Sequence, residues 1–215
     1  MEIFPNSTFE IITSKDGSDR DTESFLQKTE QPKFCLSGQA FVSYKLTSKS
    51  FLSLGVGYQN TGYKTTKLPI SYNPGDDPRV RFEAEDPNDP NLPTDIEITY
   101  NHHSIQFPLF YNYNFGKKFF VRGGLSYIIT VSNTSNADLY FASGDKKKEN
   151  YPFDDLTYNN MNLTGNLGFG YTYYENSNTN LYVQFNFERF FYEMSTNGNI
   201  NRTPVSTGLI LGAKF

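Results

Sequence analysis

Few side chains in this sequence have the types and spacing that chemistry requires. His102 and His103 are the only histidines, and they are adjacent. In a strand their side chains would point to opposite faces, so the two rings could not hold one ion together. The single cysteine, Cys35, excludes an internal disulfide and a cysteine-clustered metal site. We therefore predict no catalytic, cofactor-binding or metal-binding residue, and no cofactor.

The stretch from Tyr72 to Glu97 is rich in proline and concentrates carboxylates. Carboxylate oxygens suit calcium, but their spacing here matches no EF-hand loop. Two interpretations remain open: a solvated acidic loop, or a divalent-ion site that bridges to lipopolysaccharide. The acidic residues in question are Asp76, Asp77, Glu83, Glu85, Asp86, Asp89 and Asp95.

Two glycine pairs, Gly55 with Gly57 and Gly168 with Gly170, invite a comparison with phosphate-binding loops. Both pairs lie inside alternating segments with no helix after them, so the geometry that cradles phosphate is missing. We interpret these glycines as relief of crowding inside a narrow structure. No nucleophile motif is present either, and we predict that the protein is not an enzyme.

The composition favours half-buried strands. Aromatic residues make up 17 % of the chain and all hydrophobic residues only 37 %, with a mean hydropathy of −0.57. Aromatic side chains pack well on a pleated surface, and no apolar run is long enough for a membrane-spanning helix. The net charge of −4 excludes a basic surface for nucleic acid.

Alternation of apolar and polar residues with period two predicts the strands. Seven segments show it clearly, and the start of the chain, about 2–13, is needed as an eighth so that no strand edge stays open. This first strand is the weakest, because Pro5 cannot donate a backbone hydrogen bond. The seven clear segments are 33–46, 52–59, 104–115, 119–132, 161–173, 181–188 and 205–215.

The links between these segments alternate between short and long. Short polar links alternate with long ones at about 14–32, 64–98, 133–158 and 194–203. This pattern is typical of an all-β, eight-stranded antiparallel up-and-down transmembrane β-barrel with short periplasmic turns and long extracellular loops. We expect one outer-membrane β-barrel domain over residues 1–215.

Alternation alone leaves two orientations open. In a soluble lipocalin-like carrier of a hydrophobic ligand the apolar face would line the cavity, whereas in a membrane barrel it would meet lipid. The polar face here is mostly Gly, Ser, Thr, Asn and Gln, which suits a narrow lumen better than a water-facing surface. The membrane orientation makes Lys45, Arg122, Glu188 and Lys214 candidate lumen ions. It also places an aromatic girdle at Tyr111, Tyr113, Phe115, Phe119, Tyr171 and Tyr173.

Several segments resemble a known family. Residues 100–131, YNHHSIQFPLFYNYNFGKKFFVRGGLSYIITV, are similar to the core motif of the outer-membrane β-barrel family common in Bacteroidota, the PorT-like group. Residues 41–64 resemble its second hairpin, and NLTGNLGFGYTY (162–173) with the closing STGLILGAKF resemble its last strands. The family's glycine-rich first strand has no clear counterpart.

The resemblance implies a non-enzymatic protein of the bacterial outer membrane that anchors surface loops, with a role in envelope structure, adhesion or secretion. The implied partners are outer-membrane lipid and lipopolysaccharide, the barrel-assembly machinery, and envelope or secretion proteins. Leu211, Ala213 and Phe215 resemble the strand signal that the assembly machinery recognises. Residues 1–5 do not resemble a secretory signal, so we expect the signal peptide to be missing from this sequence.

Overall fold

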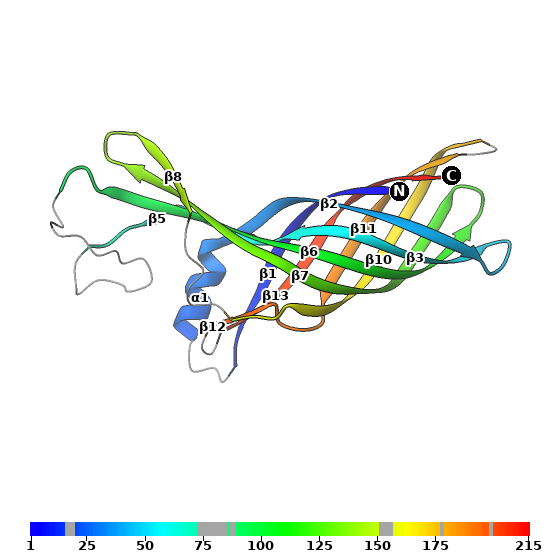
Figure 1. Ribbon diagram of the computed structural model, residues 1–215, viewed down its shortest axis with the longest axis horizontal. Helices are drawn as coiled ribbons and strands as arrows, with labels where there is room; N and C mark the ends of the chain where they lie inside the picture. Colours follow the sequence, from blue (N-terminus) through cyan, green and yellow to red (C-terminus); the bar gives the residue numbers. More distant parts are fainter. Residues whose placement is uncertain (16–19, 73–85, 87–88, 151–156, 177–178, 198–199) are drawn as a thin grey trace.

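The computed structural model describes residues 1–15, 20–72, 86, 89–150, 157–176, 179–197 and 200–215. Long strands form a closed antiparallel ring in which each strand pairs with its sequence neighbour in the ring and the last pairs with the first (Figure 1). The predicted eight-stranded up-and-down barrel is confirmed. Its strands are β1 (Glu2–Ser14), β2 (Glu30–Lys45), β3 (Ser50–Thr61), β6 (Pro93–Phe115), β7 (Phe119–Phe141), β10 (Met161–Glu175), β11 (Asn180–Phe190) and β13 (Ile200–Lys214).

Shorter elements occupy the long connections. The helix α1 (Arg20–Thr29) joins β1 to β2, with acidic residues in its first turn and Lys28 in its last, as the helix dipole favours. No helix among the described residues is long and apolar enough to cross a membrane. The remaining strands are β4 (Tyr63–Thr65), β5 (Leu68–Pro69), β8 (Lys146–Asn150), β9 (Thr157–Tyr158) and β12 (Ser195–Asn197).

The first strand closes the barrel. β1 pairs with β13 from Glu2 opposite Gly212 to Ser14 opposite Ile200, and with β2 on its other side. The pairing with β13 is interrupted at Phe4 and Pro5, and this irregularity accommodates the missing N–H of the proline. The segment with the weakest pattern is therefore a full member of the ring.

Both termini and the short turns lie at the same end of the barrel (Figure 1). The turn between β6 and β7 contains Gly116 at φ 77°, a left-handed conformation that glycine adopts without strain. By the pattern of outer-membrane barrels this is the periplasmic end, and the long connections are extracellular.

The prediction of loops at 64–98 and 133–158 is wrong in part. β6 and β7 are each 23 residues long and continue as a paired hairpin well beyond the barrel, where β4, β5 and β8 join them. We call this extension the arm: residues 93–100 and 135–141 with β4, β5 and β8. The alternation of the arm is diluted by prolines and charged residues, so the sequence pattern reads as a loop.

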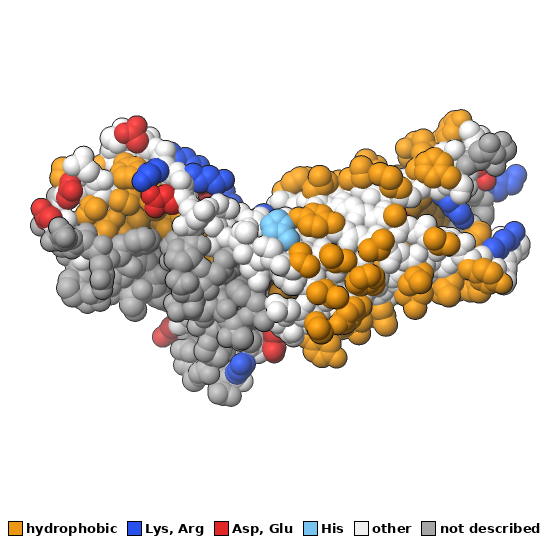
Figure 2. All heavy atoms as spheres, in the orientation of Figure 1, with side chains coloured by type: hydrophobic (Ala, Val, Ile, Leu, Met, Phe, Trp, Pro, Cys, Tyr) orange, Lys and Arg blue, Asp and Glu red, His pale blue; other side chains and the backbone are white. Residues whose placement is uncertain are grey.

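The apolar side chains of the barrel lie outside. Figure 2 shows them covering the visible face of the barrel, and strongly exposed members include Val42 (81 %), Leu54 (61 %) and Leu167 (64 %). Alternate residues on the same strands are buried and polar, among them Ser53 and Asn186. This arrangement is the opposite of a soluble carrier's and is the one that lipid requires.

Gly123 and Gly124 provide a matched pair for testing the tight interior. A Cβ atom on Gly124 would lie 2.1 Å from the backbone oxygen of Leu109, whereas one on Gly123 would lie 3.9 Å from its nearest neighbour. We expect Gly124→Ala to lower the free energy of unfolding by about 2 kcal/mol, because the backbone must shift. Gly123→Ala should change it by less than about 0.5 kcal/mol. Urea unfolding in lipid vesicles measures both, and equal values would contradict the steric argument.

Candidate functional site

The lumen is crossed near its periplasmic end by an ion pair between opposite walls. Arg122 Nη1 on β7 lies 2.6 Å from Glu2 Oε1 on β1. Gln39 Nε2 donates to the other carboxylate oxygen of Glu2 at 2.6 Å, and the Tyr182 hydroxyl donates to the first. Arg122 Nε donates to Asn112 Oδ1 at 2.7 Å. Four further barrel strands, β2, β6, β7 and β11, are thereby tied to β1.

Aromatic rings hold the Arg122 guanidinium from several sides. Its central carbon lies 5.4 Å from the ring centre of Phe41, 5.2 Å from that of Phe110 and 5.9 Å from that of Tyr182. Cation–π contacts of this kind are strengthened where water is excluded. A cavity of about 340 Å³ lies at this mouth, with Arg122 among its lining residues. The ion pair therefore forms the floor of a periplasmic vestibule.

A second polar layer surrounds Glu188 in the middle of the barrel. The side chain of Glu188 is 2 % exposed. Gln59 Nε2 donates to its Oε2 at 2.5 Å, and Thr164 Oγ1 donates to its Oε1 at 2.8 Å. A buried carboxylate needs such donors to offset its lost hydration.

A third layer lies toward the extracellular end, where Arg202 is placed between two carboxylates. Arg202 Nη2 lies 2.9 Å from Glu30 Oε1, and its Nε lies 3.6 Å from Glu10 Oε2. The His102 Nε2 atom lies 3.7 Å from Glu10 Oε1. This layer connects β1, β2, β6 and β13, so it spans the seam at which the barrel closes.

The candidate lumen ions separate into two groups. Arg122 and Glu188 are enclosed, whereas Lys45 and Lys214 are exposed. Lys214 lines the vestibule and its Nζ lies 3.9 Å above the ring of Phe51. The two lysines are not enclosed because they are the last residues of their strands, where the barrel opens to water.

Sequence reasoning missed four other charged residues of the interior: Glu2, Glu10, Glu30 and Arg202. Glu2 and Glu10 lie eight residues apart in β1, and the side chains of all four residues are buried. The even spacing of Glu2 and Glu10 indicates that both face the same side of a strand, but only once this weakly alternating segment is known to be a strand. Glu30 and Arg202 lie in segments that read as loops.

The two histidines lie on opposite faces, as the strand geometry predicts. His102 is fully buried and its Nδ1 is 2.8 Å from Asn133 Oδ1, while His103 is half-buried on the outside. Cys35 is buried. Among the described residues, no group of three or more His, Cys, Asp or Glu side chains is arranged to hold a metal ion.

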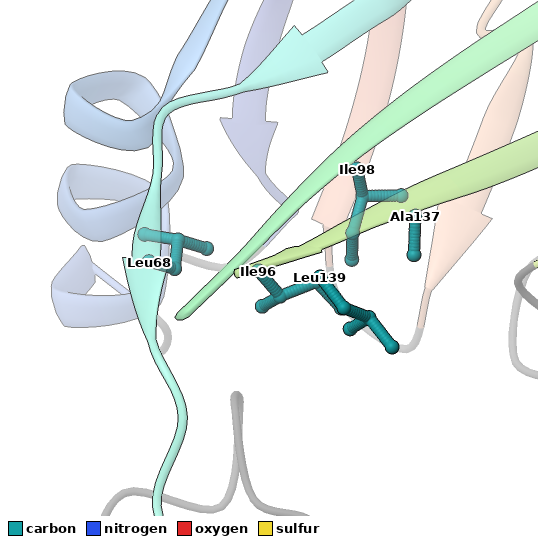
Figure 3. Close-up of a cluster of buried hydrophobic side chains, with 5 residues drawn as sticks. All are labelled: Leu68, Ile96, Ile98, Ala137 and Leu139. Atoms are coloured by element: carbon teal, nitrogen blue, oxygen red, sulfur yellow. The ribbon is translucent and has the colours of Figure 1, made fainter. Parts of the chain in front are cut away.

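The arm has a hydrophobic core of its own. Leu68 from β5, Ile96 and Ile98 from β6, and Ala137 and Leu139 from β7 pack together on one face of the sheet (Figure 3). Ile96 is only 1 % exposed. The alternation along β6 and β7 sends these side chains to the same face, and Phe25 of α1 packs against the cluster. The arm is therefore a folded sheet that continues from the barrel wall.

The other face of the arm carries ion pairs. Lys64 lies 2.7 Å from Glu97, Lys67 lies 3.1 Å from Asp95, and Lys146 lies 3.0 Å from Asp138. The hydrogen bond from the Thr94 hydroxyl is the main cause that lowers the pKa of Asp95, and Lys67 lowers it further. This carboxylate therefore stays charged.

The acidic stretch is described only in part. Asp76, Asp77, Glu83 and Glu85 lie outside the described residues. Asp95 pairs with Lys67, and Asp89 Oδ1 accepts a hydrogen bond from the backbone of Asn91 at 2.9 Å. An ion site in this stretch remains a prediction.

The aromatic girdle residues gather on the outer surface at the periplasmic end. The ring centres of Phe115 and Phe119 are 6.0 Å apart, and those of Phe119 and Tyr171 are 5.1 Å apart. Tyr111, Tyr113 and Tyr173 are exposed on the same strands. On the last strand, Leu211 is 53 % and Phe215 is 88 % exposed, while Ala213 is half-buried.

Comparison with known proteins agrees with this architecture. A family model described as outer membrane protein beta-barrel domain matches residues 6–192. No curated protein sequence matches the chain.

Two solved structures illustrate the likeness. Neisserial surface protein A (NspA) is 10 % identical with a TM-score of 0.37, covering 98 % of this chain and 95 % of that one. Ail, the attachment invasion locus protein of Yersinia pestis, solved in complex with the heparin analogue sucrose octasulfate, is 8 % identical with a TM-score of 0.39. That likeness covers 99 % of this chain and 95 % of Ail.

The ion pair of the vestibule floor gives a stability prediction. Arg122→Met leaves Glu2 buried without its cation, and we expect the free energy of unfolding to fall by about 3–5 kcal/mol. Replacing both residues, as Glu2→Gln with Arg122→Met, should recover much of this loss. Lys214→Met at the same mouth should cost less than about 0.5 kcal/mol, since Lys214 is exposed. Urea unfolding of the parent protein and the three variants tests the coupling between Glu2 and Arg122. A double variant as unstable as Arg122→Met would contradict it.

Proposed function

The chain belongs to the outer membrane protein beta-barrel domain family and lies in the bacterial outer membrane, and from this premise we propose that it fixes the extracellular arm to the membrane for binding at the cell surface. The observation that carries the proposal is the arm itself. A protein that only crossed the membrane would need no sheet with its own hydrophobic core beyond the barrel. The proposed role is non-enzymatic: adhesion, envelope structure, or accessory service to a secretion complex.

The filled lumen supports a role outside transport. Glu2 and Arg122 cross the interior near the periplasmic end, and Glu188 and Arg202 occupy it further along. An eight-stranded barrel encloses little more than the space its side chains fill. Solutes would have to displace buried charges, so the barrel acts as an anchor.

We infer a narrower placement from the sequence motifs. The similarity of residues 100–131 and 162–173 to the PorT-like outer-membrane family of Bacteroidota supports an accessory role beside secretion or envelope proteins. In that setting the partners of the arm are proteins of the cell envelope.

The role of the arm is tested by unfolding it while keeping the barrel. Ile96→Asp places a carboxylate in the core of the arm, where its burial is costly, while Glu97→Gln on the opposite face is the matched control. In cells lacking the gene, each variant is expressed, and surface attachment and protein secretion are measured. Heat-dependent gel mobility confirms that the barrel is folded.

We expect Ile96→Asp to give a folded barrel that rescues neither activity and an arm that external protease cleaves. Glu97→Gln should rescue whichever activity the gene supports. Full rescue by Ile96→Asp would show that the arm is not the functional part.

The end of β13 is proposed as the signal for the assembly machinery. Phe215 is 88 % exposed, so its side chain contributes little to folded packing. We expect Phe215→Ala to reduce the amount of barrel in the outer membrane several-fold in cells, with unchanged stability of the protein refolded in vesicles. Lys45→Ala, at an exposed residue of the same end of the barrel, is the control. Equal amounts of all three proteins in cells would refute the signal.

A further inference from the structure

A cluster of polar side chains lies on the outer wall of the barrel, where β2, β3 and β6 leave the apolar belt. Lys33 Nζ donates to Asn60 Oδ1 at 3.0 Å and to Asn101 Oδ1 at 2.5 Å. His103 Nδ1 is 2.5 Å from the Tyr58 hydroxyl and 3.3 Å from Asn60 Nδ2. We call these five residues the outer-wall cluster.

The alternation of β2 slips near Lys33, and the contacts of its ammonium group with Asn60 and Asn101 place that group on the outer wall. Glu30 contacts Arg202 inside the barrel and Cys35 is buried, although they are five residues apart. Strict alternation would place them on opposite faces, so the pattern shifts by one residue between them. Lys33 then reaches Asn60, which lies between the buried Gln59 and Thr61 and therefore faces outward.

The cluster has an uncompensated positive charge. The described partners of the Lys33 ammonium are two amide oxygens and the Cys35 thiol, and no described carboxylate lies within ion-pair distance of it. The side chain is half-buried, so water screens its charge less than that of a free surface lysine. His103 lies on the same face, and because its Nδ1 faces the amide nitrogen of Asn60, its Nε2–H is left to donate a hydrogen bond to an anion.

The position of the cluster is that of the extracellular membrane interface. Tyr58 pairs with Ile105 and Asn60 pairs with His103, so the cluster begins where the last exposed apolar residues of β3 and β6 end. Figure 2 shows histidine surface between the apolar belt and the arm, and His102 is fully buried. Two residues along a strand span about 7 Å, which brings the cluster to head-group depth.

We propose that the outer-wall cluster binds a phosphate group of an outer-leaflet glycolipid, the lipid A part of lipopolysaccharide. Lys33 and His103 donate to the phosphate oxygens, and Asn60 and Asn101 hold Lys33 in place. The exposed Phe34 lies beside Lys33 and can contact the acyl chains. This inference depends on the membrane location of the barrel and not on the role of the arm.

The two histidines allow a site-specific measurement. The full chain is reconstituted in phosphatidylcholine nanodiscs, and the NMR signals of both imidazole rings are followed as lipid A is added. The probes are lipid A with its phosphates, the same glycolipid without them, and inorganic phosphate. His102 is the internal control because it is enclosed in the lumen.

We expect phosphorylated lipid A to shift the His103 signal and not the His102 signal. Lys33→Gln should weaken the apparent affinity about tenfold, as loss of one charge-assisted contact implies, while Lys33→Arg should keep it. Lys49→Gln, in the periplasmic turn between β2 and β3, should bind lipid A with the affinity of the parent protein. If Lys33→Gln does not fold, the response of the His103 signal to the three probes, in the parent protein and in Lys33→Arg, still tests the proposal.

Three results would overturn the proposal. One is an unchanged His103 signal with phosphorylated lipid A. Another is an equal shift with the glycolipid that lacks phosphates, which would assign the contact to sugar or acyl groups. The third is an equal response to inorganic phosphate at the same concentration, which would make the cluster a site for the free anion.

Discussion

Closure of the β1–β13 seam is the constraint on which the whole structure depends. In hydrocarbon an unpaired backbone group has no water to bond, so a strand sheet in a membrane must have no edge. The register from Glu2 to Ser14 against β13 meets this requirement, and it is supported from inside by Arg202 between Glu10 and Glu30. Once the ring is closed, every second residue must face lipid and the others must share a narrow interior.

That narrow interior explains why buried charges occur in layers. A carboxylate taken from water needs donors or a cation close to it, and each of Glu2, Glu188 and Glu30 has one from a different strand. Since these partners come from opposite walls, the layers fix how the strands are arranged around the axis. The same contacts block the lumen, so the features that specify the barrel also exclude a pore.

The sequence predicted the ring and its orientation because alternation with period two is independent of partners. Strands such as 161–173 carry that signal residue by residue. It could not predict the arm, whose apolar residues Ile96 and Ile98 are flanked by charges and preceded by proline, nor the interior role of Glu2 and Arg202. Their positions depend on which strands become neighbours across the lumen. Lys33 is a further case, because it lies near a one-residue slip in β2 and its contacts with Asn60 and Asn101 come from other strands.

The continuity of β6 and β7 has a mechanical consequence. Each strand is continuous from the periplasmic turn through the membrane into the arm, with one register shift in their pairing at the junction, between His103 and Ser104. At about 3.3 Å per residue, the 8 residues of β6 in the arm extend it by roughly 26 Å. The hairpin stays paired on both sides of the register shift at His103 and Ser104, so a ligand held at the tip of the arm would stand well above the membrane surface. A pull on that ligand would load the hydrogen bonds of the barrel wall in shear, where many share the force at once.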